Sequence, residues 1–361
     1  MNTRREVRRP WIRYAGLLWA AVQCGYAGGP LTAQVAAVPI LEYRFAGIGV
    51  EFRLLVCGEE RSRVEQACAT CRRRVEELNQ IFSDYSANSE VARLRLAPVG
   101  EPVPVSAEMY TLLSRGQEVS RRSDGAFDVT VGPLTQRWRT ARRAGKLPDG
   151  TAWQVARASV GWHQLELMEP DRIRLRRPGM ELDFGGIGQG FAADECLEIL
   201  RRAGFPAALV DASGDIAIGE PPPQRPQGWR VAVASDPAAS DMTSYLELAR
   251  CGIATSGDQL QHLQQGSDRL SHILDPRSGE PVRNAPRVTV IARDATEADA
   301  LASALSVLSA EQGLALIDTT EGASALLVYG ESHTDQANAC SAARVQKSSR
   351  FPEFVPVPAQ K

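Results

Sequence analysis

The spacing between two short β-type segments constrains the fold of this chain most strongly. Residues 164–168 and 172–175 have strand character and are separated only by the turn Glu169-Pro170-Asp171. A connection that short can join antiparallel strands, whereas parallel strands need a crossover of a dozen or more residues. Helical patterns lie on both sides of this hairpin. We therefore predict an α+β fold with a largely antiparallel sheet and packed helices.

Apolar periodicity divides the rest of the chain into helix-type and strand-type segments. Helices are expected over residues 61–82, 107–123, 153–160, 191–203, 295–308 and 311–317. Strands are expected over residues 41–56, 207–211, 229–234, 288–292 and 324–329. We predict one folded unit over residues 41–330. The polar, proline-containing residues 331–361 are predicted to form a disordered tail.

Length and composition exclude several classes of protein. A chain of 361 residues suggests about two domains, and one large domain is also compatible with it. The hydrophobic share of 43% and the charged share of 23% exclude a fully disordered chain, a collagen and a coiled coil. A mean hydropathy of −0.22 excludes a polytopic membrane protein. The formal charge of −2 gives no electrostatic reason to expect a nucleic-acid partner.

The N-terminus has the order of a secretory signal. Five arginines within the first 13 residues precede an apolar run over 14–26, and small residues follow up to residue 37. We predict a signal peptide over residues 1–33, with cleavage by residue 37, and a periplasmic location. The pair Arg8-Arg9 is compatible with a twin-arginine signal or with an ordinary basic region. Gln23 precedes Cys24 where a lipoprotein signal has a small residue, which argues against lipidation.

A C-x-x-C pair, Cys68 and Cys71, lies in the middle of the helix expected over 61–82. Redox motifs of this kind normally open a helix after a strand. One isolated pair also lacks the second pair that a zinc site needs. A structural role is therefore favoured over a catalytic dithiol.

Three segments carry residue types that catalysis uses. Asp299 and Ser303 are four residues apart and share one helical face, where their oxygens suit Mg²⁺, although a solvated face has the same spacing. Four glycines over residues 185–190 precede a helix; they suit either a close backbone approach to an anionic ligand or a tight connector. His272, three residues before Asp275, is a candidate acid–base group or a structural histidine.

The order of the motifs is more specific than any one of them. The chain carries F-S-x-Y, D-G-A-F-D-V-T-V-G-P-L, L-D-F-G-G-I-G-x-G, S-G-D-I, A-T-S-G-D, S-H-I-L-D-P-R-S-G and A-D-A-L-A-S in that order. This series resembles the ApbE flavin transferases, which are FAD:protein FMN transferases, over residues 43–329. The resemblance implies an ApbE-like (T-fold-like) fold. It also implies transfer of FMN from FAD to a Thr hydroxyl of an acceptor flavoprotein, with Mg²⁺ required and AMP released.

The resemblance assigns roles to individual residues. It implies that His272 assists proton transfer and that Mg²⁺ is held by Asp299, Ser303 and the main-chain carbonyl of Gly186. The cofactor contacts that it implies are Ala46, Tyr85, Ala126, Phe127, Asp128, Asp183, Gln189 and Leu274. The acceptor implied is a membrane respiratory subunit.

Three positions depart from the family pattern. Ser303 stands where the family often has Thr, Ala46 where it usually has Met, and Gln189 where it commonly has Lys or Glu. These departures bear on efficiency more than on binding. Two other functions remain open: an FAD pyrophosphatase that yields FMN and AMP, and an exported flavin-binding protein without catalysis.

Overall fold

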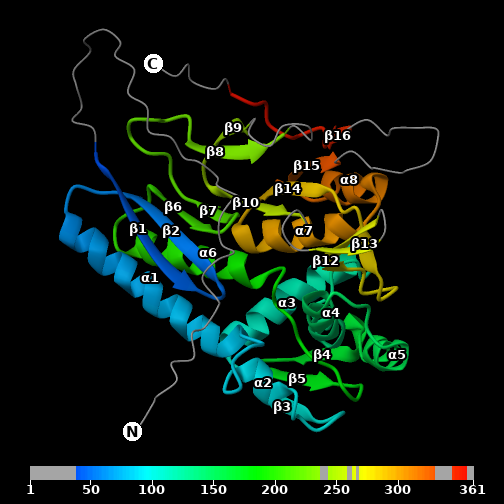
Figure 1. The fold of residues 1–361 in the computed structure, drawn as a ribbon. Coiled ribbons are helices and arrows are strands. Elements are labelled where there is room, and N and C mark those ends of the chain that lie inside the picture. Colours follow the sequence, from blue (N-terminus) through cyan, green and yellow to red (C-terminus); the bar gives the residue numbers. More distant parts are fainter. Residues whose placement is uncertain (1–37, 236–242, 258–261, 266–267, 330–343, 356–361) are drawn as a thin grey trace, which may run out of the picture.

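The computed structural model describes residues 38–235, 243–257, 262–265, 268–329 and 344–355. Its centre is an eight-stranded sheet in the order β1-β2-β6-β7-β10-β14-β15-β16, and every neighbouring pair is antiparallel. The strands are β1 (Ile40–Gly47), β2 (Val50–Cys57), β6 (Ala208–Ala212), β7 (Asp215–Ile218), β10 (Cys251–Ser256), β14 (Arg287–Ala292), β15 (Ser324–Tyr329) and β16 (Arg344–Lys347) (Figure 1). The predicted α+β class with a largely antiparallel sheet is confirmed.

The segment expected as one strand over 41–56 is a hairpin. β1 and β2 pair up to Gly47 and Val50, and the turn between them consists of Ile48 and Gly49. Both turn residues have positive φ, 45° and 77°. Two-residue hairpin turns of this kind follow the natural twist of the strands. Apolar residues alternate on both sides of the turn, so the sequence pattern indicated one continuous strand.

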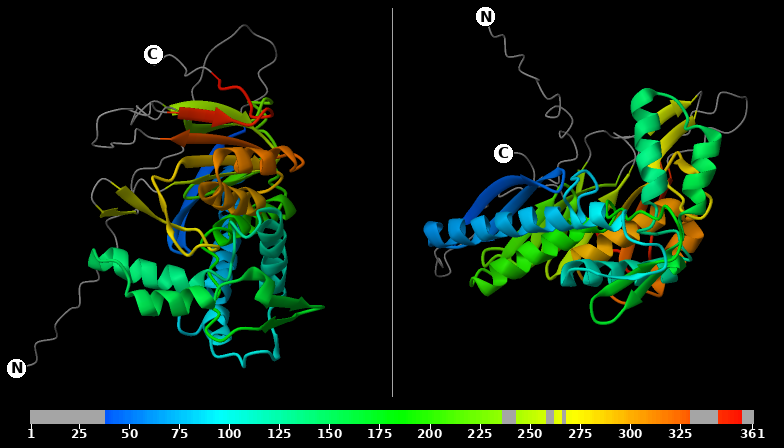
Figure 2. Two further views of the ribbon diagram at one scale, coloured as in Figure 1. Left: turned by 90° about the vertical axis from the view of Figure 1, so that its right-hand side faces the viewer. Right: turned by 90° about the horizontal axis from the view of Figure 1, so that it is seen from below.

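Three helices cover one face of the sheet: α1 (Arg61–Phe82), α6 (Gly188–Arg202) and α7 (Ala295–Val307) (Figure 2). The buried side of α1 repeats at helical spacing and includes Cys68 and Cys71, which are free thiols within the core. This agrees with a structural role for the C-x-x-C pair. In the described part of the chain, no helix combines the length and the apolar character that crossing a membrane requires.

The opposite face of the sheet is covered by a hairpin of β8 (Trp229–Ala234) and β9 (Thr243–Leu248). Neighbouring strand residues therefore serve different cores: Leu54 packs on the helical side and Leu55 on the β8–β9 side. A sheet that is buried on both faces explains why its strands read as nearly continuous apolar runs. α8 (Ala310–Asp318) precedes β15.

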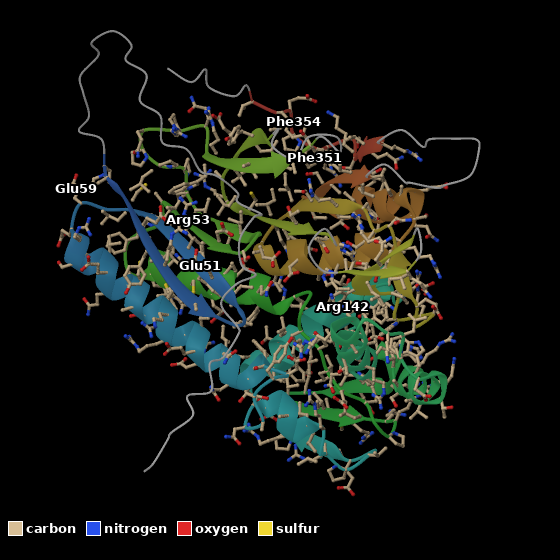
Figure 3. All side chains as sticks on the ribbon, in the orientation of Figure 1. Glu51, Arg53, Glu59, Arg142, Phe351 and Phe354 are labelled. Carbon is tan, nitrogen blue, oxygen red and sulfur yellow. The ribbon has the colours of Figure 1, made fainter. Side chains whose placement is uncertain are left out.

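The C-terminal segment corrects the predicted disordered tail. β16 pairs with β15 from Leu326↔Lys347 to Tyr329↔Arg344, and the Val355 amide donates to the Tyr245 carbonyl at 2.8 Å. Phe351, 5% exposed, packs in the hydrophobic cluster that β8 and β9 form with the main sheet, and Phe354 lies beside it (Figure 3). The prediction of disorder is wrong for residues 344–355, and the folded unit extends beyond 330. Residues 330–343 and 356–361 lie outside the described residues.

The remaining elements lie beyond the helical face (Figures 1 and 2). The helices are α2 (Glu90–Leu94), α3 (Ala107–Arg122), α4 (Gly132–Ala144), α5 (Gly150–Ala158) and the short η1 (Trp162–Gln164). One small sheet contains β3 (Pro102–Pro104), β5 (Arg172–Leu175) and β4 (Leu165–Met168). The other contains β11 (His262–Gln265), β12 (Asp268–Leu274) and β13 (Pro281–Arg283). The predicted hairpin over 164–175 is confirmed as β4–β5.

Candidate active site

A cavity of about 710 Å³ opens between the main sheet, α4, α7 and β12. This volume lies in the range of sites that hold cofactor-sized ligands. Glu51 and Arg53 line it from β2, and Arg142 lines it from α4 on another side (Figure 3). The predicted residues on its wall are Tyr85, Ala126, Phe127, Asp128, Asp183, Gly186, Gln189, His272, Leu274, Asp299 and Ser303. Motifs that are far apart in sequence therefore converge on one space.

Ala46 is the predicted contact that the structure does not bring to the wall. It lies exposed on β1, whereas the turn residues Ile48 and Gly49 line the cavity. On this side the cavity is lined by Arg44 of β1, the two turn residues, and Val50, Glu51 and Arg53 of β2.

Asp299 is a buried carboxylate in the second turn of α7. It is 6% exposed, and its Oδ2 accepts a hydrogen bond from the Gly190 amide at 3.2 Å. Burial raises the pKa of Asp299 to about 7; the Gly190 hydrogen bond lowers it, and the nearby Asp194 charge raises it. Gly190 lies so close to α7 that a Cβ there would clash with the Ala295 carbonyl. The lack of a side chain at Gly190 therefore makes this hydrogen bond possible.

Ser303 and Gly186 lie on the same cavity wall as Asp299. Ser303 is on the same helix face, and a Cβ built on Gly186 would lie 2.5 Å from the Ser303 Oγ. The loop before α6 thus runs directly against this hydroxyl.

Asp215, at the start of β7, is a buried carboxylate on the same wall that the site prediction did not include. Burial raises its pKa well above the usual range, and the charges of Asp299 and Asp211 raise it further. Within the described ranges, no ion pair joins Asp215 or Asp299 to a basic side chain. Uncompensated buried carboxylates are costly, and a divalent cation would offset that cost.

The oxygen donors fit a magnesium ion. Mg²⁺ is typically bound by one or two carboxylates and completes its shell with water and substrate phosphates. Among the described residues, no group of three or more His, Cys, Asp or Glu side chains gathers as a metal cage. Such a cage is not required for Mg²⁺. A hydroxyl, a carbonyl and carboxylates would supply part of its coordination shell, and phosphate oxygens of a substrate would occupy the remaining positions.

Asp183 is held in place from α4. Its Oδ2 accepts from the Thr135 hydroxyl at 2.6 Å, and its Oδ1 accepts from the Gly185 amide at 2.8 Å. Arg139 lies 3.7 Å from Asp183 and stacks on the Tyr85 ring, with its guanidinium carbon 4.5 Å from the ring centroid. The Tyr85 residue is 69% exposed, so this pair presents an aromatic surface at the cavity.

Asp128 orders the loop that carries Ala126 and Phe127. Its Oδ1 accepts from the amide and the hydroxyl of Thr130, both at 2.7 Å, and its Oδ2 accepts from the Trp162 amide at 2.8 Å. Burial raises the pKa of Asp128, and these hydrogen bonds lower it. The carboxylate therefore fixes the loop that lines the cavity.

His272 lines the cavity from β12. The nearby Asp275 is occupied in its own turn, where it accepts from the Arg277 amide at 2.9 Å and pairs with the Arg277 guanidinium. This engagement favours His272 over Asp275 as the proton acceptor at the cavity.

The ApbE family model matches residues 48–327, which is most of the chain. This chain belongs to the ApbE family. Its relatives include the FAD:protein FMN transferase of Vibrio cholerae serotype O1, 30% identical over 69% of this chain and 75% of that protein. The FAD:protein FMN transferase of Escherichia coli K12 is 26% identical over 81% of this chain and 84% of that protein.

Solved ApbE structures share the fold. The apo flavinyl transferase ApbE of Pseudomonas stutzeri superposes with a TM-score of 0.76 at 27% identity, covering 88% of this chain and 96% of that one. The ApbE protein of Thermotoga maritima gives 0.74 at 27% identity, with 86% and 97% covered. The resemblance inferred from the motif order is confirmed.

Sequence reasoning missed the part of the ApbE site that α4 contributes. Thr135, Trp138, Arg139 and Arg142 all line the cavity from this helix. No helix was predicted over residues 132–144. Helix signals were nevertheless present, because Pro133 occupies the first turn of α4 and Gly145 ends it in a left-handed conformation.

Proposed function

We propose that this protein transfers the FMN moiety of FAD to a hydroxyl group of an acceptor protein. The observation that carries the proposal is the convergence of the ApbE motifs on one cavity lined by Asp299, Ser303 and His272. The relatives named FAD:protein FMN transferase support it.

In the proposed reaction, FAD lies in the cavity with Tyr85 and Asp183 among its contacts. Asp299, Ser303 and the Gly186 carbonyl hold Mg²⁺, with Asp215 close by. When bound, Mg²⁺ supplies positive charge that neutralises the pyrophosphate. The cavity residues hold FAD so that its FMN phosphorus faces the acceptor.

The bond changes follow from phosphoryl-transfer chemistry. The acceptor oxygen bonds to the FMN phosphorus while the bond from that phosphorus to the bridging oxygen of AMP breaks. His272 takes the hydroxyl proton, and AMP leaves. FMN remains on the acceptor through a phosphoester. We propose Thr as the acceptor residue and a membrane respiratory subunit as its carrier, as the family resemblance implies.

The proposal places this reaction outside the cytoplasm, because the first 33 residues have the order of a secretory signal. That signal and Cys24 lie outside the described residues. Export is tested by fractionating cells that produce the full chain and locating the shortened protein.

The activity is tested by incubating the purified protein with FAD, Mg²⁺ and an extract of source cells that lack this protein. Flavin fluorescence that stays on a denatured protein band, with release of AMP, supports transfer. FMN and AMP without a labelled band would indicate a pyrophosphatase. Intact bound FAD would indicate a flavin-binding protein. Reactions with EDTA, or without the purified protein, are the controls.

A further inference from the structure

His272 lies in an irregular stretch of β12. Leu270 pairs with Arg283 on β13 and Leu274 pairs with Pro281, so four steps along β12 oppose two steps along β13. A bulge of this kind bends a strand and re-aims its side chains, and bulges are frequent beside active sites. His272 is the central residue of the bulged stretch. Its direction therefore depends on whatever fixes the backbone there.

The two ends of the bulge are held by apolar packing. Leu270 and Leu274 are buried in one cluster with Leu134 and Trp138 of α4. The Trp138 ring contacts Trp153 of α5 edge-on, with centroids 6.3 Å apart. The cluster thus ties β12 to the α4–α5 pair.

One polar contact reaches into the bulge itself. The Trp138 Nε1–H donates to the Ser271 carbonyl at 2.8 Å, and both side chains are fully buried. Ser271 immediately precedes His272, and its hydroxyl accepts from the Ile273 amide at 3.0 Å. The backbone on both sides of His272 is therefore fixed by hydrogen bonds.

The same helix also holds the other side of the cavity. Thr135 donates to Asp183, and Arg139 donates to Asp84 at 2.8 Å while covering Tyr85. α4 thus connects the predicted flavin contacts to the strand that carries His272.

We infer that Trp138 is a positioning residue for His272: its indole N–H fixes the β12 bulge so that the imidazole faces the transfer site. The inference rests on the proposed function and names a residue that acts through His272 without touching the reacting atoms. Trp138 also lines the cavity, but its indole N–H is directed to the Ser271 carbonyl, so we expect FAD binding not to depend on that donor.

The test is Trp138→Phe, which keeps an aromatic ring in the cluster but removes the donor together with part of the indole ring. Trp153→Phe is the matched control, because it makes the same change in the neighbouring ring. Initial rates of covalent flavin labelling are measured at saturating FAD, with the extract described above as the acceptor source. FAD affinity is measured separately by flavin fluorescence.

We expect Trp138→Phe to lower the transfer rate about tenfold, the order of one lost hydrogen bond, with FAD affinity unchanged. The decisive comparison places the same substitution in a His272→Asn background. Because Trp138 acts through His272, the substitution has no further effect on the rate in that background. Trp153→Phe leaves the rate unchanged.

The inference is overturned if Trp138→Phe transfers FMN at the wild-type rate, or if it lowers the rate by the same factor in both backgrounds. Equal losses of rate and FAD affinity would also overturn it, since they indicate a general packing role. If Trp138→Phe does not fold, benzothienylalanine at position 138 keeps the ring size without the N–H. Absence of labelling by the wild-type protein would instead refute the proposed function.

Discussion

Replacing Asp299 with Asn should stabilise the metal-free protein while abolishing transfer. The carboxylate is 6% exposed and has its pKa raised to about 7 by burial. An unfolded Asp has a pKa of about 3.9, so the folded state binds the proton more tightly. The contribution of Asp299 to stability is therefore complete at low pH and is lost as the pH rises from about 4 to about 7.

The size of the effect follows from the shift in pKa. The pKa of Asp299 lies about three units above that of an unfolded Asp. At a pH above neutral, this shift lowers the free energy of unfolding by about 4 kcal/mol. Asn keeps an oxygen that accepts from Gly190 and carries no charge to desolvate. Asp299→Asn should recover much of that free energy of unfolding at pH 8 in EDTA, and little of it at low pH.

The assay is urea unfolding of both proteins in EDTA, at about pH 4 and about pH 8. Glu321→Gln is the control, because it makes the same chemical change at an exposed turn position. Adding Mg²⁺ should stabilise the wild type and leave Asp299→Asn unchanged, since ligands stabilise only the state that binds them. The reasoning fails if Asp299→Asn is no more stable than the wild type at pH 8 in EDTA.

Three other outcomes are expected. His272→Asn should lower kcat by about 10²–10⁴-fold, with FAD affinity by flavin fluorescence little changed. Gly190→Ala should lower the urea unfolding free energy by about 1–3 kcal/mol because its Cβ would clash with α7, whereas Gly150→Ala, in open space, should not. Ending the chain before β16 should cost about 3–5 kcal/mol, from loss of the buried Phe351 alone; ending it after residue 355 should be neutral in the same assay.

Strong local patterns in the sequence were sufficient to predict several elements of the fold. The apolar spacing over 61–82 coincides with α1, and Asp299 and Ser303 do share the cavity face of α7. The hairpin signal around Pro170 also appears as β4–β5. In each case the information lies within a few residues, where helical or strand periodicity is set.

Elements defined by distant partners were not predictable in this way. β16 is a polar segment that becomes a strand only because β15 offers it an edge to pair with. No strand was predicted over residues 251–256, where β10 forms between β7 and β14. The extended conformation of β10 is therefore due to its burial between two strands and not to the intrinsic β-propensity of its residues.

The glycine-rich segment shows how motif and geometry differ. From the sequence, its four glycines were compatible with a ligand-binding loop and with a tight connector. In the structure, individual glycines make different contacts. Gly186 brings the backbone against Ser303, whereas Gly190 lies inside α6 and allows that helix to approach α7. This approach places an amide of the α6 N-terminus on Asp299, where the helix dipole favours negative charge.

The close contact of α6 and α7 therefore positions Asp299, a ligand of the proposed metal site. An amide hydrogen bond and a helix N-terminus stabilise the Asp299 carboxylate only in part, since its pKa is still raised to about 7. The remaining cost keeps this anion poised to bind a cation. A basic side chain in the same place would stabilise the protein and would also compete with Mg²⁺ for the carboxylate. Among the described residues, Asp299 has no such ion pair. The protein thus gives up some stability and leaves the carboxylate available for the proposed Mg²⁺.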